Sequence, residues 1–138
     1  MTSIPANIFG DNSSLEIVDL SGNWIQSLQP RHFSSLGKLR TLSLRYNKLT
    51  LLKDETFSAL QNLEFLYLDE NGLSSIENNV FNETTLLQVL HLQGNELRYI
   101  KKKWLEMLPS LKTLKLNNNK ITGIESGSFD NLDALTEL

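Results

Sequence analysis

The side chains best suited to proton transfer near neutral pH are the two histidines, His32 and His91. They fall at different points of a repeating pattern, on what we expect to be opposite sides of the molecule, so they cannot converge on one metal ion or substrate. The chain has no cysteine, no glycine-rich phosphate-binding loop, and no serine with a histidine and a carboxylate placed to activate it. We therefore predict that the protein is not an enzyme and uses no cofactor or metal.

Charge and hydropathy narrow the range of partners. The formal net charge of the 138 residues is −3, and acidic and basic residues are spread along the whole chain. A nucleic-acid-binding protein would show a strongly basic face, so nucleic acid is not expected as a partner. No stretch approaches the roughly 18 apolar residues that a membrane span needs. Membrane attachment would therefore come only through a span outside this chain.

A period of 24 residues organises the chain and places its polar side chains. Each repeat has leucine at its first position, an apolar residue at its fourth, leucine at its sixth, asparagine at its ninth, and phenylalanine or leucine at its nineteenth. The register defines a partial repeat (1–14), five complete repeats (15–38, 39–62, 63–86, 87–110 and 111–134) and a partial repeat (135–138). We treat the chain as one domain, a single solenoid segment.

The pattern within one repeat predicts its local structure. Apolar residues at positions four and six, with polar or variable ones at three, five and seven, have the period of two expected of a strand with one buried face. The asparagine at position nine marks the end of the strand, where its amide can serve backbone groups that no strand partner reaches. We therefore expect an asparagine ladder between neighbouring turns, formed by Asn23, Asn47, Asn71, Asn95 and Asn119. The remaining apolar positions fill the interior, because one repeat alone cannot bury its own face.

The unit LxxLxLxxNxLxxLxxxxFxxLxx resembles the 24-residue typical leucine-rich repeat of extracellular proteins, and the resemblance covers the whole chain. It implies an α/β repeat fold: a curved right-handed coil with a concave parallel sheet and convex loops and short helical turns. It also implies a binding function, as in Toll-family receptors, which recognise microbial or endogenous ligands and signal as dimers. Leucine-rich proteins of adhesion, guidance or the matrix are the alternative, and a cytosolic scaffold is a third reading. The first two imply an extracellular or luminal location.

The exposed sheet face is where we expect a protein or microbial ligand to bind. Residues 24 apart become neighbours on adjacent strands roughly 4.8 Å apart, so the variable positions form columns across the sheet. Aromatic residues with a charged rim are typical of recognition surfaces. The predicted ligand-binding residues are Arg45, Tyr46, Phe65, Tyr67, Asp69, His91 and Lys115. The alternative is that these rings merely cover the sheet and that Arg45 and Asp69 form only a surface ion pair, worth under about 1 kcal/mol.

His91 suggests a pH-dependent variant of this hypothesis. On a ligand face between Tyr67 and Lys115, a histidine would gain charge at endosomal pH, although the lysine would oppose its protonation. Some Toll-family receptors are thought to use such a change, so the resemblance makes this a specific expectation.

Departures from the repeat consensus single out other surfaces. The sequons Asn12-Ser13-Ser14 and Asn82-Glu83-Thr84 make Asn12 and Asn82 possible N-glycosylation sites on the outer or lateral face. Position twenty-two of the third complete repeat is Thr84, and we expect Leu86 to fill part of the space left there. The segment 101–108 predicts a short helical turn on the convex side. Its lysines are interpreted as a solvated face, with a docking patch that includes Trp104 as the alternative.

Both ends stop within a repeat, and neither has a recognisable cap. Leu135 and Leu138 are then expected to expose apolar surface at one end, and Ile4 and Phe9 at the other. We therefore expect an excerpt of a longer ectodomain that, in isolation, associates end to end or is only marginally stable.

Overall fold

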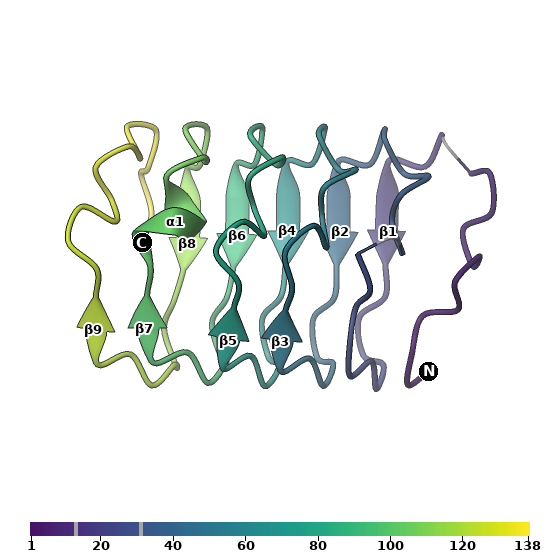
Figure 1. Cartoon of the computed structure of the whole chain (residues 1–138), viewed down its shortest axis with the longest axis horizontal. Coiled ribbons are helices and arrows are strands. Elements are labelled where there is room, and N and C mark those ends of the chain that lie inside the picture. The colour runs from purple at the N-terminus through teal and green to yellow at the C-terminus, as the bar shows by residue number, and fades with distance from the viewer. Residues whose placement is uncertain (13, 31) are drawn as a thin grey trace.

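The computed structural model describes residues 1–12, 14–30 and 32–138, and it forms the predicted solenoid (Figure 1). One short strand per complete repeat contributes to a five-stranded sheet of order β1-β2-β4-β6-β8. The strands are β1 (Ile17–Asp19), β2 (Thr41–Ser43), β4 (Phe65–Tyr67), β6 (Val89–His91) and β8 (Thr113–Lys115). All pair in parallel with residue i opposite i+24, as in Ile17 opposite Thr41. The repeat register of the sequence is thus the strand register of the sheet.

The opposite side of the coil is more regular than the predicted loops and helical turns. The strands β3 (Leu51–Leu52) and β5 (Ser75–Ile76) form one parallel pair, and β7 (Tyr99–Ile100) and β9 (Gly123–Ile124) form another. The predicted helical turn is present as α1 (Lys102–Leu105) on this side. None of the described residues forms a helix long and apolar enough to cross a membrane.

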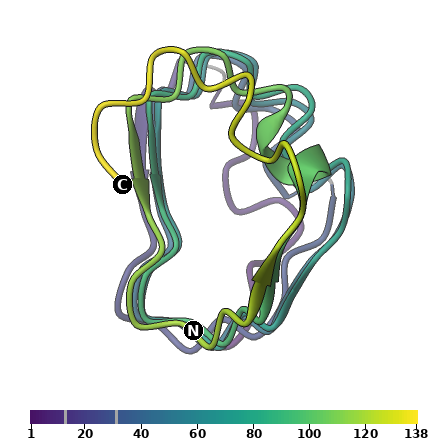
Figure 2. The same ribbon diagram turned by 90° about the vertical axis from the view of Figure 1, so that its left-hand side faces the viewer.

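Figure 2 shows the backbone of the coil end on. Its interior is filled by one aliphatic and aromatic core. The fourth-position residues Leu42, Leu66 and Leu90 are fully buried, while their strand neighbours are partly exposed, as the period of two predicts. Phenylalanines from successive turns form a stack, with 6.2 Å between the ring centroids of Phe33 and Phe57 and the same separation between Phe57 and Phe81. Full burial of one such side chain contributes about 1.5–3 kcal/mol.

The asparagine ladder joins neighbouring turns through both ends of each amide. In four of the five asparagines, Oδ1 accepts from a backbone N–H of the preceding turn at 3.0 Å, and Nδ2 donates to position-six carbonyls of its own and the preceding turn. These four are Asn47, Asn71, Asn95 and Asn119. Asn23 makes only the bonds to its own turn, plus a 3.4 Å contact with the amino group of Met1. Four predicted members therefore bridge two turns through backbone groups.

The residue before each ladder asparagine has a left-handed backbone. The φ angles at position eight are 66° at Gly22, 52° at Tyr46, 55° at Glu70, 67° at Gly94 and 55° at Asn118. This conformation costs a side-chain-bearing residue roughly 1–2 kcal/mol and costs glycine almost nothing. Tyr46 and Glu70 therefore hold a strained position that two other repeats fill with glycine.

Two expectations were wrong, those for Leu86 and Ile4, and so was the alternative that Trp104 is part of a docking patch. Leu86 does not fill the space beside Thr84: it is exposed, whereas Thr84 is fully buried and satisfies its hydroxyl by donating to the Phe81 carbonyl at 3.0 Å. Trp104 is not available for docking, because its ring is buried and its Nε1 donates to the carbonyl of Ile76 at 3.1 Å. Ile4, expected to be bare, is buried within the core.

Candidate binding face on the sheet

Arg45 lies just after β2 on the exposed sheet face, close to two tyrosine rings. Its guanidinium carbon lies 5.7 Å from the centroid of the Tyr46 ring and 5.9 Å from that of Tyr67. Tyr67 points outward from β4, and Tyr46 follows β2, where its left-handed backbone leaves the ring 58% exposed. Desolvated contacts of this kind are worth up to about 2 kcal/mol, and exposed ones less.

Asp69 lies beneath this group and is nearly inaccessible. Its side chain is only 1% exposed, and its Oδ2 accepts from Nε of Arg45 at 2.8 Å. The hydrogen bond to Asp69 raises the pKa of Arg45 above its usual value. The interpretation of this contact as a plain surface ion pair was therefore wrong: one partner is exposed, but the other is buried and depends on it.

His91 packs against Tyr67 from the neighbouring strand. The two rings stand nearly perpendicular with 5.0 Å between their centroids, an edge-to-face geometry. Burial lowers the pKa of His91 below its ordinary value of 6.5, and Arg45 and Lys115 lower it further, while Asp69 partly opposes them. His91 therefore resists protonation as the pH falls, which weakens the endosomal hypothesis.

We call Arg45, Tyr46, Tyr67, Asp69 and His91 the sheet-face cluster. The remaining predicted binding residues lie on the same face but apart from these contacts. Phe65 stands two residues before Tyr67 on β4 and is half-buried. Lys115 pairs with Glu137 and is opposite His91 in the strand register.

Three buried polar atoms on this face have no hydrogen-bond partner within the described part of the chain. They are Oδ1 of Asp69, Nδ1 of His91 and Oε1 of Gln93. Buried polar groups are normally satisfied, so a cluster of exceptions indicates a functional surface or bound water. The sequence prediction left out Gln93, although it occupies position seven beside Asp69 in the next repeat.

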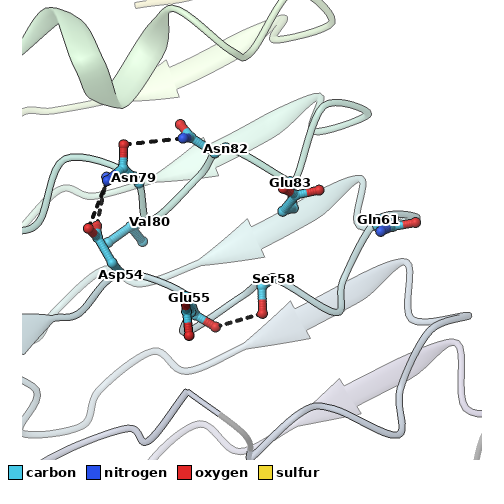
Figure 3. Close-up of a pocket in the computed structure, with 8 residues that line it drawn as sticks. All are labelled: Asp54, Glu55, Ser58, Gln61, Asn79, Val80, Asn82 and Glu83. Atoms are coloured by element: carbon cyan, nitrogen blue, oxygen red, sulfur yellow. Dashed lines mark hydrogen bonds between the residues drawn. The ribbon is translucent and has the colours of Figure 1, made fainter.

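A separate hollow of about 410 Å³ lies on the far side of the coil, between the repeats that contain Asp54 and Asn82 (Figure 3). Asp54 accepts from both the backbone N–H and Nδ2 of Asn79, at 2.7 and 2.8 Å, and Asn79 accepts from Asn82 at 3.2 Å. These polar groups bond to one another and join two turns. We interpret the network as structural, and none of the described residues forms a group of three or more potential metal ligands from His, Cys, Asp and Glu.

The two sequon asparagines differ in their surroundings. Asn12 is exposed, and Ser13 of that sequon lies outside the described residues. Asn82 is half-buried at the wall of the hollow, with its Nδ2 already donating to Asn79.

A family model described as leucine rich repeat matches residues 1–49, 37–97 and 85–138, which together span the whole chain. The chain belongs to the leucine-rich repeat family. The predicted resemblance and fold class are thereby confirmed. A search of curated protein sequences gave no match.

Solved structures of leucine-rich repeat domains superimpose well on this member of the family. Toll of Drosophila, in its glycosylated complex with Spatzle, is 29% identical, with a TM-score of 0.90 over 95% of this chain and 17% of Toll. The leucine-rich repeat domain of APL1B is 25% identical, with a TM-score of 0.81 over 87% of this chain and 36% of that one. The chain thus spans about a sixth and about a third of these two proteins. Its likeness to them supports a general role in protein binding.

Proposed function

We propose that this leucine-rich repeat segment binds a protein ligand through its sheet-face cluster, as part of an extracellular receptor ectodomain of the Toll type. The observation that carries the proposal is the arrangement of Arg45 between Tyr46 and Tyr67, above the buried Asp69. Tyrosine and arginine are enriched among the residues that dominate binding energy at interfaces. Tyr46 also presents its exposed ring from a left-handed position that other repeats fill with Gly22 and Gly94, so the ring is kept despite the cost to the backbone.

The likeness to Toll supports the receptor reading and its innate immune role. That protein was solved in complex with Spatzle, and the complex is described as a hub of development and innate immunity. By extension, recognition of an endogenous or microbial ligand, dimerisation of the receptor and an extracellular location are proposals for this chain. A secreted adhesion or matrix protein would use the same sheet face without signalling.

The test is a binding screen of the purified chain against an array of extracellular proteins. Partners of the wild type should be lost in the double variant Arg45→Ala/Tyr67→Ala and retained in Lys103→Ala, which removes an exposed cation on the far side. Circular dichroism checks that both variants fold. Partners that bind all three proteins equally, or that depend on Lys103, would refute the assignment of the binding face.

The two sequons are proposed as glycosylation sites of the secreted protein. Mass spectrometry of chain secreted from eukaryotic cells, before and after enzymatic deglycosylation, should show glycan at Asn12 or Asn82. Unmodified peptides at both positions would remove this support for an extracellular location.

End-to-end association is proposed for the isolated chain. Leu138 is 70% exposed and lines an apolar hollow with Ile121, Ile124 and Phe129 at the last turn. Light scattering over a concentration series should show a rising mass. A mass that stays at one chain at every concentration would contradict this.

A further inference from the structure

We propose that the protein ligand of the sheet face carries a basic side chain, a lysine or an arginine, which lies against Tyr46 and Tyr67 while Asp19 and Glu70 supply the opposing charge. This inference rests on the proposed function, because it assigns a chemistry to the ligand of the same face.

The balance of charge on the face favours a cation. The outward positions of the sheet are positions three, five, seven and eight of each repeat. Within the described residues, these positions carry four carboxylates and two cationic side chains, namely Asp19, Asp69, Glu70, Glu137, Arg45 and Lys115. Arg45 pairs with Asp69, and Lys115 with Glu137, so both cations are already neutralised. Burial lowers the pKa of His91, which disfavours a positive charge on its ring. The net charge of the face is therefore negative.

The two remaining carboxylates are exposed and flank the tyrosines. Asp19 forms no salt bridge with any residue that the structure describes, and it is oriented by Ser21, whose backbone N–H and hydroxyl donate to it at 2.9 and 2.5 Å. It lies in the same register row as Tyr67, two strands away, which corresponds to about 9–10 Å. Glu70 also forms no salt bridge within the described part of the chain, and its carboxylate lies over Gly94, where any side chain would collide with it.

Unpartnered acceptors provide a second, independent observation. Oδ1 of the 1% exposed Asp69 and Oε1 of Gln93 accept no hydrogen bond from any described residue. An ammonium or guanidinium group supplies several N–H donors at once. Neighbouring side chains cover both oxygens, so a ligand reaches them only after a side-chain shift, whereas Asp19 and Glu70 are open to it without one. A cation on a tyrosine face also gains a cation–π contact.

The two tyrosine rings are held in place by Arg45. Tyr46 and Tyr67 both contact the guanidinium of Arg45, which is itself tied to Asp69, so the rings are held in place before a ligand arrives. A carboxylate ligand approaching Arg45 would meet the fields of Asp19, Asp69 and Glu70 together. The same surface therefore discriminates against acidic ligands.

The experiment compares three small probes by NMR: acetylated and amidated Gly-Lys-Gly, Gly-Glu-Gly and Gly-Gln-Gly, each at the same millimolar concentration and low salt. The expected result is that the lysine peptide gives the largest amide shifts, centred on Tyr46, Tyr67 and Glu70. Glu70→Gln and Asp19→Asn should each weaken its binding roughly two- to fivefold, as loss of an exposed charge pair does. Glu83→Gln, which removes one exposed charge on the far side, should leave the shifts unchanged.

Shifts that are no larger for lysine than for glutamine, or that survive both sheet-face substitutions, would overturn the inference. Larger shifts with the glutamate peptide would reverse its sign and indicate an acidic ligand. Either outcome leaves the proposed function intact if Arg45→Ala/Tyr67→Ala still abolishes protein binding in the array. Retention of protein binding by that double variant would defeat the proposed function separately.

Discussion

Replacement of Asn47 should destabilise the coil more than replacement of its ladder counterpart at the first turn. Asn47 is 2% exposed, and its Nδ2 donates at 3.0 Å to the carbonyls of Leu20 and Leu44. Its Oδ1 accepts from the N–H of Ile25, also at 3.0 Å. In Asn47→Ala, each leucine carbonyl keeps one amide from a neighbouring ladder residue, but the N–H of the fully buried Ile25 loses the one side-chain acceptor that the described residues give it.

The expected loss of stability follows from the hydrogen bonds that Asn47→Ala removes. One buried unsatisfied N–H costs about 1–3 kcal/mol, and each lost hydrogen bond about 0.5–1.5 kcal/mol, so we expect Asn47→Ala to lower the free energy of unfolding by about 3 kcal/mol. The unfolding entropy of about 2.1 cal/mol/K per residue converts this into a fall in melting temperature of roughly 10 °C. Asn23 is half-buried and bonds only to its own turn and to the terminal amine, so Asn23→Ala should cost about 1 kcal/mol or less.

Urea denaturation followed by circular dichroism measures both free energies, with the m-value checking that unfolding stays cooperative. Asn47→Asp adds a test of the donor. It keeps an oxygen for the N–H of Ile25 but turns a second oxygen toward the carbonyls of Leu20, Leu44 and Arg45, so it should be at least as damaging as alanine at pH 7. Protonation at pH 4 should relieve part of that loss relative to Asn47→Ala. Equal losses in Asn47→Ala and Asn23→Ala would refute the reasoning.

Three further predictions concern the sheet-face cluster. Tyr46→Gly relieves the left-handed strain, so the free energy of unfolding measured with urea should stay unchanged or rise by up to about 1 kcal/mol, while ligand binding falls. A loss of stability above about 1 kcal/mol would show instead that the ring stabilises the fold. Arg45→Met leaves Asp69 buried without its cation and should lower the free energy of unfolding by about 2–3 kcal/mol. Adding Asp69→Asn to this variant should restore part of that loss. No restoration would contradict the dependence of Asp69 on Arg45. Burial holds the pKa of His91 below 6.5 in the folded state, so protonation favours the unfolded chain, and stability should fall as the pH drops below about 6.5 toward the lower pKa of the folded state. In thermal melts over this pH range, His91→Gln should make the melting temperature depend less steeply on pH. The remaining dependence should include a part due to His32, whose pKa is also lowered by burial. An unchanged pH dependence would refute the contribution of His91.

Much of the fold could be predicted because a period of 24 residues translates directly into strand register. Once Leu42 and Leu66 share a position in the repeat, their strands must pair with that offset, and the buried and exposed faces follow. The ladder was equally predictable, because an amide that recurs at the end of every strand must bond to the backbone of neighbouring turns if it is buried there. The paired strands on the far side carry no such signal, since Leu51–Leu52 and Ser75–Ile76 share only one apolar position.

The sequence predicted which residues lie on the binding face but not how deeply each one is buried. Position seven alternates outward along the strand, which suggested an exposed Asp69, yet the neighbouring side chains cover its carboxylate. That burial depends on how residues of adjacent repeats pack, and a repeat alignment contains no such information. The sequence does contain one sign of the strained backbone at Tyr46, because glycine occupies the same position in two other repeats. The burial of Trp104 left no trace in the sequence, because position eighteen has no consensus residue and the other complete repeats carry His32, Thr56, Val80 and Ser128 there.

The bonds between turns also determine how this protein would respond to tension. Strand pairs and ladder amides join each turn to the next along the long axis, so a pull between the two ends loads the turns in series (Figure 1). In the isolated chain, the turn at each end has a neighbour on one side only and should detach first. Each detachment frees 24 residues, which extend to about 80 Å. Under load, such a coil would lengthen stepwise from its ends while the central turns, which carry the cluster, stay folded longest.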